Sequence, residues 1–574
     1  MGLLDLLGVI AIGLLGALSV TGLQSRQPSG QVASALEILG IENFSFQAQA
    51  TFLGVGSVAL LVGRTILSIV FTRKILFFLS RRGAKISADL IAKLLSQPLL
   101  TVQARTTQET LYSVTSGVSL ITLQVLATSV VLLSDIALLT IMATGLFIVD
   151  PLTSIGTFSI FFFISLFLYK FMHVRASVLG EKSADLNIKS NEKIVEVFGS
   201  YRESVVRNRR DYYAREIGKL RYSLADASAE TGFLPYVSKY VIESAVVLGA
   251  LLIGAAQFVL QDAMQAVSTL SIFLAAGTRI APAVLRIQQG TIQIKNSLGA
   301  AMPTLDLIEM LDKVKLELNV NDKLDIVHSG FTAEIKVNNI SASYPGMSLP
   351  ALSQISFEIS AGESVAVVGE SGAGKTTLID VLLGVLNTDS GAVAISGLAP
   401  AETVMRWPGA IAYVPQDVAI AAGTFRENVA LGYPADEATD ELVMRALKIA
   451  HLDEYVNSLP NGIDAEVGER GARISGGQRQ RLGIARAMFT QPHLLVLDEA
   501  TSALDGETEA NISDSISALR GSTTILMIAH RLSTVRNADK IIYLSQGKII
   551  AMGSFEYLRS AVPDFDRQAK LMGL

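Results

Sequence analysis

No cysteine occurs among the 574 residues, and only 17% of them are charged. The absence of cysteine excludes a disulfide framework, thiol chemistry and cysteine-based zinc sites. Cations and acids are mixed and sum to a net charge of -5, so the composition gives no reason to expect nucleic acid as a partner. The scarcity of charge goes with a high apolar content, because half of the residues are hydrophobic and the mean hydropathy is +0.44. These values are typical of a membrane protein.

The apolar residues are concentrated in the first half of the chain. Six runs are long enough to cross about 30 Å of hydrocarbon, and they lie near residues 3–23, 52–72, 126–149, 152–172, 232–257 and 264–286. Two long segments between them, 73–125 and 173–231, are polar and rich in lysine and arginine. The positive-inside rule predicts that these segments lie in the cytoplasm, and with them both chain termini.

A few ionisable residues fall inside the predicted spans: Arg64, Asp135, Lys239, Glu243, Arg279 and Arg286. Such side chains cost a few kcal/mol or more at the bilayer centre and normally face a cavity or a partner. Because the cations outnumber the acids, we expect an anionic substrate near Arg64, Lys239, Arg279 and Arg286. The alternatives are that Arg286 extends to the membrane interface and that Lys239 pairs with Glu243, four residues further on.

The second half contains a phosphate-binding motif. Residues 369–376 read Gly-Glu-Ser-Gly-Ala-Gly-Lys-Thr and fit the pattern G-x-x-x-x-G-K-S/T between an apolar strand and a helix start. In this context backbone N–H groups converge on phosphate oxygens at the helix N-terminus. Lys375 is predicted to reach the β- and γ-phosphates and Thr376 to bind Mg²⁺ through its hydroxyl. The expected nucleotide contacts here are Gly369, Ser371, Gly372, Gly374, Lys375, Thr376 and Thr377.

A second apolar strand, Leu494 to Leu497, ends in the two acids Asp498 and Glu499. An acid at the end of a buried strand can hold Mg²⁺, and an adjacent acid can polarise the attacking water. We therefore assign Asp498 to the metal and Glu499 to the general base.

The string Ile474-Ser475-Gly476-Gly477-Gln478 completes a set of motifs in a fixed order. With the phosphate loop, Gln416, Asp498-Glu499, Asp505 and His530, it makes residues 331–574 resemble the nucleotide-binding domain of an ATP-binding cassette (ABC) protein. The resemblance implies that two cassettes pair head to tail. Each ATP then lies between the phosphate loop of one chain and the residues Ser475, Gly476, Gly477 and Gln478 of the other.

The resemblance also implies roles for single residues. Tyr344 matches the aromatic that stacks on adenine, Gln416 the glutamine that senses Mg²⁺ and the γ-phosphate, and His530 the histidine that contacts the γ-phosphate. Asp505 matches the aspartate that organises the dimer contact. As alternatives, Tyr344 is an aromatic on an edge strand, Gln416 a solvated loop residue and His530 a core histidine.

Taken together, the two halves predict a polytopic α-helical membrane domain (1–318) and a linker (319–330), followed by an α/β phosphate-loop ATPase cassette (331–574). This order resembles a half-transporter of the ABC exporter type. The resemblance implies a homodimer that hydrolyses ATP with Mg²⁺ to drive transport. It also implies a location in the cytoplasmic (inner) membrane, with the cassette in the cytoplasm. Pro98 and Gly199-Ser200-Tyr201 interrupt the cytoplasmic segments and are candidate turns that contact the cassette.

The substrate prediction depends on weaker features. The surroundings of Arg64 and Arg279 resemble those of bacterial flippases of lipid-linked oligosaccharides, whose anionic pyrophosphate would suit cations in a cavity. The alternatives are an exporter of amphipathic drugs, lipids or peptides, and an ATP-gated channel. A soluble cassette protein is a further alternative, which the six predicted spans argue against.

Overall fold

The computed structural model describes residues 36–37, 40–41, 44–149, 151–260, 263–314, 323–344, 347, 349–468, 471–500, 506–529 and 535–571. The chain divides into two compact units. Unit 1 comprises Met1–Gln97 and Val102–Leu316, and unit 2 comprises Pro98–Thr101 and Glu317–Leu574.

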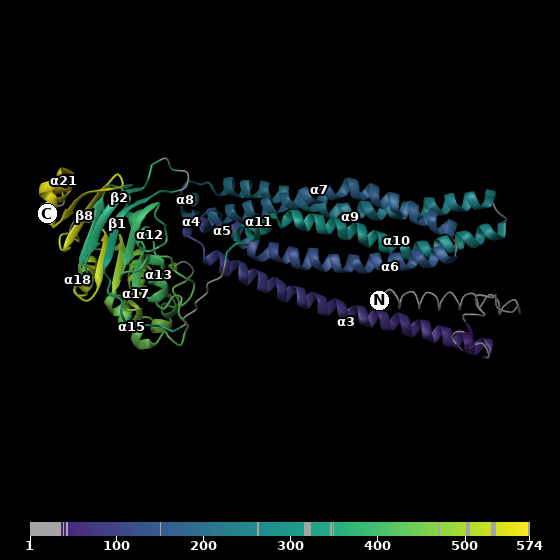
Figure 1. Ribbon diagram of the computed structural model, residues 1–574, viewed down its shortest axis with the longest axis horizontal. Coiled ribbons are helices and arrows are strands. Elements are labelled where there is room, and N and C mark those ends of the chain that lie inside the picture. The colour runs from purple at the N-terminus through teal and green to yellow at the C-terminus, as the bar shows by residue number, and fades with distance from the viewer. Residues whose placement is uncertain are drawn as a thin grey trace. The chain divides into compact units, whose positions relative to one another are not determined.

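The described part of unit 1 is helical, and Figure 1 shows α7, α9 and α10 running side by side. The long helices are α3 (Phe46–Leu95), α6 (Ala127–Val149), α7 (Pro151–Gly199), α9 (Arg210–Leu260) and α10 (Ala263–Ala300). The shorter helices are α4 (Leu99–Gln103), α5 (Thr107–Tyr112), η1 (Ser113–Gly117), η2 (Leu120–Leu126), α8 (Tyr201–Val206) and α11 (Met302–Leu311).

Local chemistry explains where several of these helices begin and end. Ser45 caps α3 by accepting a hydrogen bond from the Ala48 N–H at 3.4 Å, and Thr106 caps α5 in the same way from the Glu109 N–H at 3.2 Å. Helix α3 ends at Leu95, three residues before Pro98, because a residue that precedes proline is biased away from helical backbone. The sequence therefore sets the helix boundaries locally.

The core of unit 1 lies where α7, α9 and α10 meet, and it buries Leu168, Met172, Ile242 and Ile280. Two glycines allow α7 and α10 to approach closely. A Cβ at Gly180 would lie 2.0 Å from the Asn296 carbonyl oxygen, and one at Gly299 would lie 2.1 Å from the Ser177 carbonyl oxygen. Close backbone approach at small residues is the usual way in which membrane helices associate.

Within the described residues, three helical stretches are long and apolar enough to cross a membrane: Phe46–Leu95, Thr107–Thr144 and Ser154–Gly199. The second to sixth predicted spans lie in α3, α6, α7, α9 and α10. The first predicted span, residues 3–23, falls outside the described residues.

Unit 2 contains two sheets. The three-stranded antiparallel sheet has the order β2-β1-β4, and the six-stranded sheet has the order β5-β6-β7-β3-β8-β9. The strands are β1 (Ile335–Ala342), β2 (Leu352–Ile359), β3 (Ser364–Gly369), β4 (Ser390–Ile395), β5 (Ile411–Val414), β6 (Leu494–Asp498), β7 (Thr524–Ile528), β8 (Lys540–Ser545) and β9 (Lys548–Gly553). All pairs in the larger sheet are parallel except β8 with β9.

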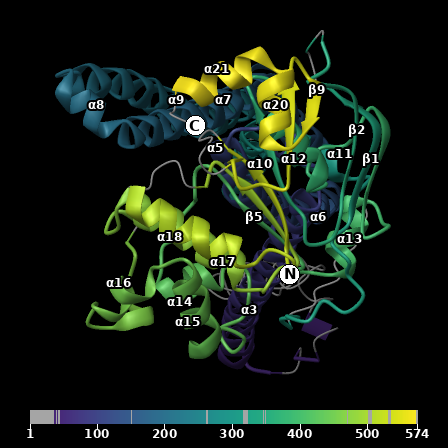
Figure 2. The same ribbon diagram turned by 90° about the vertical axis from the view of Figure 1, so that its left-hand side faces the viewer.

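The helices of unit 2 flank this sheet, and in Figure 2 α14 to α18 gather on the side away from β1 and β2. They are α12 (Lys375–Leu382), α13 (Pro400–Arg406), α14 (Phe425–Val429), α15 (Asp440–Ile449), α16 (Asp453–Asn457), η3 (Gly462–Asp464), α17 (Gly476–Met488), α18 (Gly506–Ser517), α20 (Phe555–Ala561) and α21 (Pro563–Leu571). Pro98–Thr101 groups with this unit, where Leu100 packs against an apolar cluster that includes Leu352 and Leu378.

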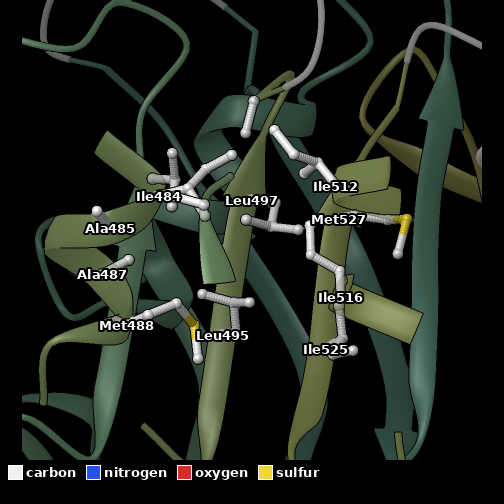
Figure 3. Close-up of a cluster of buried hydrophobic side chains, with 14 of the residues drawn as sticks. Ile484, Ala485, Ala487, Met488, Leu495, Leu497, Ile512, Ile516, Ile525 and Met527 are labelled. Carbon is white, nitrogen blue, oxygen red and sulfur yellow. The ribbon is translucent and has the colours of Figure 1, made fainter. Parts of the chain in front are cut away.

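The central strands are buried on both faces because helices or the small sheet cover each side. On β6, Leu495 and Leu497 pack against α17 and α18 (Figure 3), whereas Leu494 and Val496 belong to the cluster on the opposite face. This alternation follows from the two-residue period of a strand. The carboxyl ends of β3 and β6 are thereby fixed at one edge of the sheet.

Candidate functional site

The phosphate loop joins β3 to α12 and has the tight backbone that its glycines permit. Gly369 has φ +156° and Gly374 has φ +100°. A Cβ at Gly369 would lie 2.1 Å from the Leu544 carbonyl oxygen, and one at Gly374 would lie 2.7 Å from the Ala351 carbonyl oxygen. A side chain at either position would therefore force the loop apart. The loop delivers Lys375 and Thr376 to the first turn of α12, where unpaired N–H groups favour an anion.

Lys375 lies over this loop. Its ammonium group donates to the carbonyl oxygens of Gly369 and Glu370, both at 2.9 Å. Burial lowers the pKa of Lys375, while the charges of Glu499 and Asp498 act in the opposite direction. The structure thus brings the lysine and the two acids, which are far apart in the sequence, into one electrostatic site.

Asp498 is 4% exposed at the end of β6, next to Tyr413, whose hydroxyl donates to the Asp498 Oδ2 at 3.4 Å. Burial raises the pKa of Asp498, and the charge of Glu499 raises it further. Burial also raises the pKa of Tyr413 to about 12, with Asp498 adding to the effect. A nearby cation would stabilise the charged form of a carboxylate in such surroundings.

The residues predicted to hold Mg²⁺ fit that ion. Thr376, Gln416 and Asp498 offer oxygen ligands, which Mg²⁺ prefers. Among the described residues no group of three or more histidine, cysteine, aspartate or glutamate side chains could hold a metal ion. Mg²⁺ is usually bound through one or two carboxylates plus substrate phosphates, and Asp498 would supply one such carboxylate.

Glu499 and Gln416 lie in direct contact. The Gln416 side-chain amide donates to the Glu499 Oε2 at 3.0 Å. Glu499 has left-handed backbone with φ +49°, which is uncommon for a residue with a side chain. Its N–H donates to the Ile528 carbonyl oxygen, and its carbonyl oxygen accepts from the Gln480 side chain, both at 3.1 Å. Neighbouring strands and α17 therefore hold the predicted general base in a strained conformation of the kind found at active sites.

Tyr344 lies just after β1, and its hydroxyl lies 3.3 Å from the Thr377 Oγ1. Its ring is half-buried against the cluster that contains Leu352. Burial raises the pKa of Asp380, and a hydrogen bond from Tyr344 counters this shift. Tyr344 is thus tied to the helix that follows the phosphate loop.

The Ser-Gly-Gly-Gln segment forms the N-terminus of α17. Ser475 Oγ accepts from the Gln478 N–H at 3.2 Å, and the Gln478 Oε1 accepts from the Ser475 N–H at 2.8 Å. This reciprocal capping box fixes the first turn. Ser475 and Gly476 are exposed. A solvent-facing helix N-terminus of this kind favours an anion.

Sequence reasoning missed the residues that support the segment after Gln416. Arg486, on α17, donates to the carbonyl oxygens of Ala419 and Asn428, both at 2.9 Å. The Asn428 side chain in turn bonds the backbone N–H and carbonyl of Ala421, both at 3.0 Å. An arginine within the apolar stretch Leu482 to Met488 is the signal that could have revealed this support. Burial lowers the pKa of Arg486.

For four of the predicted site residues the structure gives no side-chain position. His530 and Asp505 fall outside the described residues. Arg64 lies in α3 and Arg279 in α10, but the description does not extend to their side chains.

The other two predicted substrate cations have acidic partners. Lys239 lies 3.9 Å from Glu243, the pairing that the sequence offered as an alternative. Arg286 binds both carboxylate oxygens of Asp135 at 2.7 to 3.1 Å, a pair between α10 and α6 that the sequence did not predict.

Residues 352–502 match the ABC transporter family. The β-(1→2)glucan export ATP-binding/permease protein of Agrobacterium fabrum is 41% identical over 271 residues, which cover 47% of this chain and 45% of that protein. The ATP-dependent lipid A-core flippase of Desulfotalea psychrophila is 34% identical over 320 residues, which cover 55% and 54%. The matched segment thus spans about half the length of these curated relatives.

The whole fold resembles a solved structure, that of a bacterial Atm1-family ABC exporter with ATP bound. The likeness covers 99% of this chain and 97% of that one, with a TM-score of 0.69 and 24% identity. The C-terminal part of the chain is an ATP-binding cassette of the ABC transporter type. Together with the helical domain before it, the chain has the fold of that ABC exporter.

Proposed function

We propose that this protein is an ATP-driven exporter or flippase that works as a homodimer in the cytoplasmic (inner) membrane. The membrane domain, residues 1–318, would provide the translocation path. The linker, residues 319–330, would join it to the cassette, residues 331–574, in the cytoplasm. The contact between Gln416 and Glu499 beside Lys375 and Asp498 carries this proposal, because it assembles the parts that ATP hydrolysis requires.

In this proposal each described residue has a task. Lys375 would exchange its two loop carbonyls for phosphate oxygens, which are stronger acceptors for an ammonium group. Glu499 would take the proton of the attacking water, and Gln416 would hold the carboxylate in place until nucleotide binds. Mg²⁺, held by Thr376, Gln416 and Asp498, would neutralise charge on the phosphates. We assign His530 to the γ-phosphate and Tyr344 to adenine.

The second chain would complete the site. The capped N-terminus of α17 exposes Ser475 and Gly476, and with Gly477 and Gln478 these would contact the ATP held by the partner's phosphate loop. Asp505 would organise the same dimer contact. Binding of ATP would stabilise the closed pair, and hydrolysis would release it, so the two nucleotide states would favour different conformations of the spans.

Replacing the proposed base tests the hydrolytic part of the proposal. A Glu499→Gln protein keeps the size of the side chain and removes the base, so we expect ATPase activity to fall by about a hundred-fold or more. ATP binding should be retained and measured by filter binding. A Glu499→Gln protein that hydrolyses ATP at the full rate would refute the assignment.

For the transported molecule we propose an anionic lipid-linked substrate such as a lipid-linked oligosaccharide. The excess of cations in the spans supports this class, and the names of relatives that are lipid A-core flippases agree with a lipid substrate. Arg64 and Arg279 are the main candidates, because Lys239 and Arg286 have acidic partners.

The Arg64→Ala/Arg279→Ala protein in liposomes should lose translocation of a fluorescent lipid-linked oligosaccharide and keep its basal ATPase activity. Unchanged translocation would contradict this assignment. It would favour the alternative, an exporter of amphipathic drugs, lipids or peptides. Current recorded across a planar bilayer would instead identify an ATP-gated channel.

A further inference from the structure

Helix α3 carries a continuous exposed face that changes from apolar to cationic along its length. Leu67, Val70, Lys74, Phe78, Arg81 and Lys85 follow one another at intervals of three or four residues, which place them on one side of the helix. All six are exposed, and the apolar Leu67, Val70 and Phe78 are 43%, 43% and 62% exposed. We call these six residues the α3 stripe.

The opposite side of α3 packs within unit 1. Leu79, Gly83 and Leu90 lie about half a turn away from the stripe and are buried. A Cβ at Gly83 would lie 2.9 Å from the Thr122 Oγ1 of η2, so the two helices are in close contact there. The stripe therefore faces away from the elements that pack on α3.

The charge of this region is unbalanced. No acid occurs between Phe46 and Ala88, whereas Arg73, Lys74, Arg81, Arg82 and Lys85 all carry positive charge. Within the described part of the chain none of these five has an ion-pair partner. Three cations on α7 and α9 do have acidic partners: Lys189 binds Asp185 at 2.9 Å, Lys193 binds Glu196 at 2.8 Å and Lys219 binds Glu216 at 2.7 Å.

The order of residues along the stripe matches the order of groups in a membrane leaflet. Leu67 and Val70 belong to the uncharged run 65–72, Lys74 comes just after this run, and Phe78 lies between Lys74 and the cations Arg81 and Lys85. Aromatic residues favour the interface, and lysine and arginine near a span attract anionic headgroups. A second copy of the chain that placed its own α3 against this stripe would bring the same uncompensated cations and is a poorer occupant.

We propose that the α3 stripe binds an anionic phospholipid of the cytoplasmic leaflet. Lys74, Arg81 and Lys85 contact the phosphate headgroup, and Leu67 and Val70 contact an acyl chain. The inference uses the membrane location of α3 and does not depend on which substrate is transported. The site thus belongs to a resident lipid, separate from the cations assigned above to the translocation path.

Lipid titration of the full-length protein tests this site. Phosphatidylglycerol is titrated onto detergent-solubilised protein by native mass spectrometry, with phosphatidylcholine as the zwitterionic comparison. The K74A/R81A/K85A protein should bind phosphatidylglycerol at least about ten-fold more weakly. The matched K189A/K193A/K219A protein loses the same number of positive charges, but from lysines that have acidic partners. Its affinity for phosphatidylglycerol should lie within about two-fold of that of the unchanged protein. The K74R/R81K/K85R protein should retain binding, and thermal unfolding verifies that every variant is folded.

Each contrary outcome overturns the proposal. Equal loss in the two alanine triples would show that net charge alone attracts the lipid. Full competition by inorganic phosphate at millimolar concentration would identify a site for a free anion instead of a lipid. A changed oligomeric state of K74A/R81A/K85A with unchanged phosphatidylglycerol binding, measured by light scattering, would identify the stripe as an interface between two copies.

Discussion

The cassette and the membrane domain use charged residues in opposite ways. In the cassette, Lys375, Asp498 and Glu499 are brought to one edge of a parallel sheet, where burial shifts the pKa of Lys375 and of Asp498. In the membrane domain, Arg286 is paired with an acid and Lys74 is exposed on a helix surface. Burial shifts the pKa values of charged groups at the candidate site, whereas pairing or exposure lets a cation persist beside apolar surface.

The largest expected effect comes from removing the lysine of the cassette. Lys375→Ala deletes the cation that lies over the phosphate loop, so ATPase activity should fall by at least about a hundred-fold. A malachite-green phosphate assay measures it. Lys548→Ala, at an exposed position on β9, is the control and should leave the activity unchanged. Equal activity of the two variants would show that Lys375 is structural only.

The second-largest expected effect comes from a packing change in the membrane domain. Gly180→Ala places a Cβ 2.0 Å from the Asn296 carbonyl oxygen, so α7 and α10 must separate and Tm should fall by several degrees. Gly218→Ala is the matched control, because no atom lies within 4 Å of its added Cβ. That control should be neutral or slightly stabilising, by about 0.5–1 kcal/mol, since alanine favours a helix over glycine. Similar Tm values for the two variants would contradict the close packing.

The ion pair between α6 and α10 should have an intermediate effect. Asp135→Asn removes the acid and leaves Arg286 beside apolar helices, so we expect a loss of about 1–2 kcal/mol, seen as a lower Tm in detergent. The double change Asp135→Asn/Arg286→Gln should recover part of this loss, because both members of the pair are then neutral. Glu216→Gln breaks the exposed pair with Lys219 and should hardly change Tm. Additive losses in the double variant would show that the pair does not couple the helices.

The smallest expected effect is a stabilisation that depends on pH. Burial raises the pKa of Asp498, so the neutral form is favoured on folding and the charged form opposes folding at neutral pH. The neutral Asp498 side chain contributes its full stabilisation below the pKa that it has in the unfolded chain. This contribution is lost as the pH rises through the higher pKa of Asp498 in the folded protein. Asp498→Asn should therefore raise the Tm of the nucleotide-free protein by about 2 °C at pH 7.5, with the gain vanishing toward pH 4. A gain that grows as the pH falls would contradict this assignment.

Much of this arrangement is predictable from local sequence because its signals are short in range. The phosphate loop, the capping box of Ser475 and Gln478, and the break near Pro98 all depend on a few adjacent residues. The buried strands read as apolar runs because both faces of a parallel sheet are covered. The left-handed backbone of Glu499 and the support that Arg486 gives to the segment after Gln416 were not predictable. Both depend on carbonyl groups that come from distant parts of the chain.

The sequence by itself determined the cassette motifs, the apolar runs and the excess of cations in the first half, because each is a property of residue type and spacing. Only the tertiary structure decided which charges meet. Arg286 pairs with Asp135 across 151 positions, Gln416 contacts Glu499 across 83, and the cations of the α3 stripe find no acid within the described chain. Such pairings depend on how helices and strands pack, and the spacing of residues in the sequence contains no direct record of that packing.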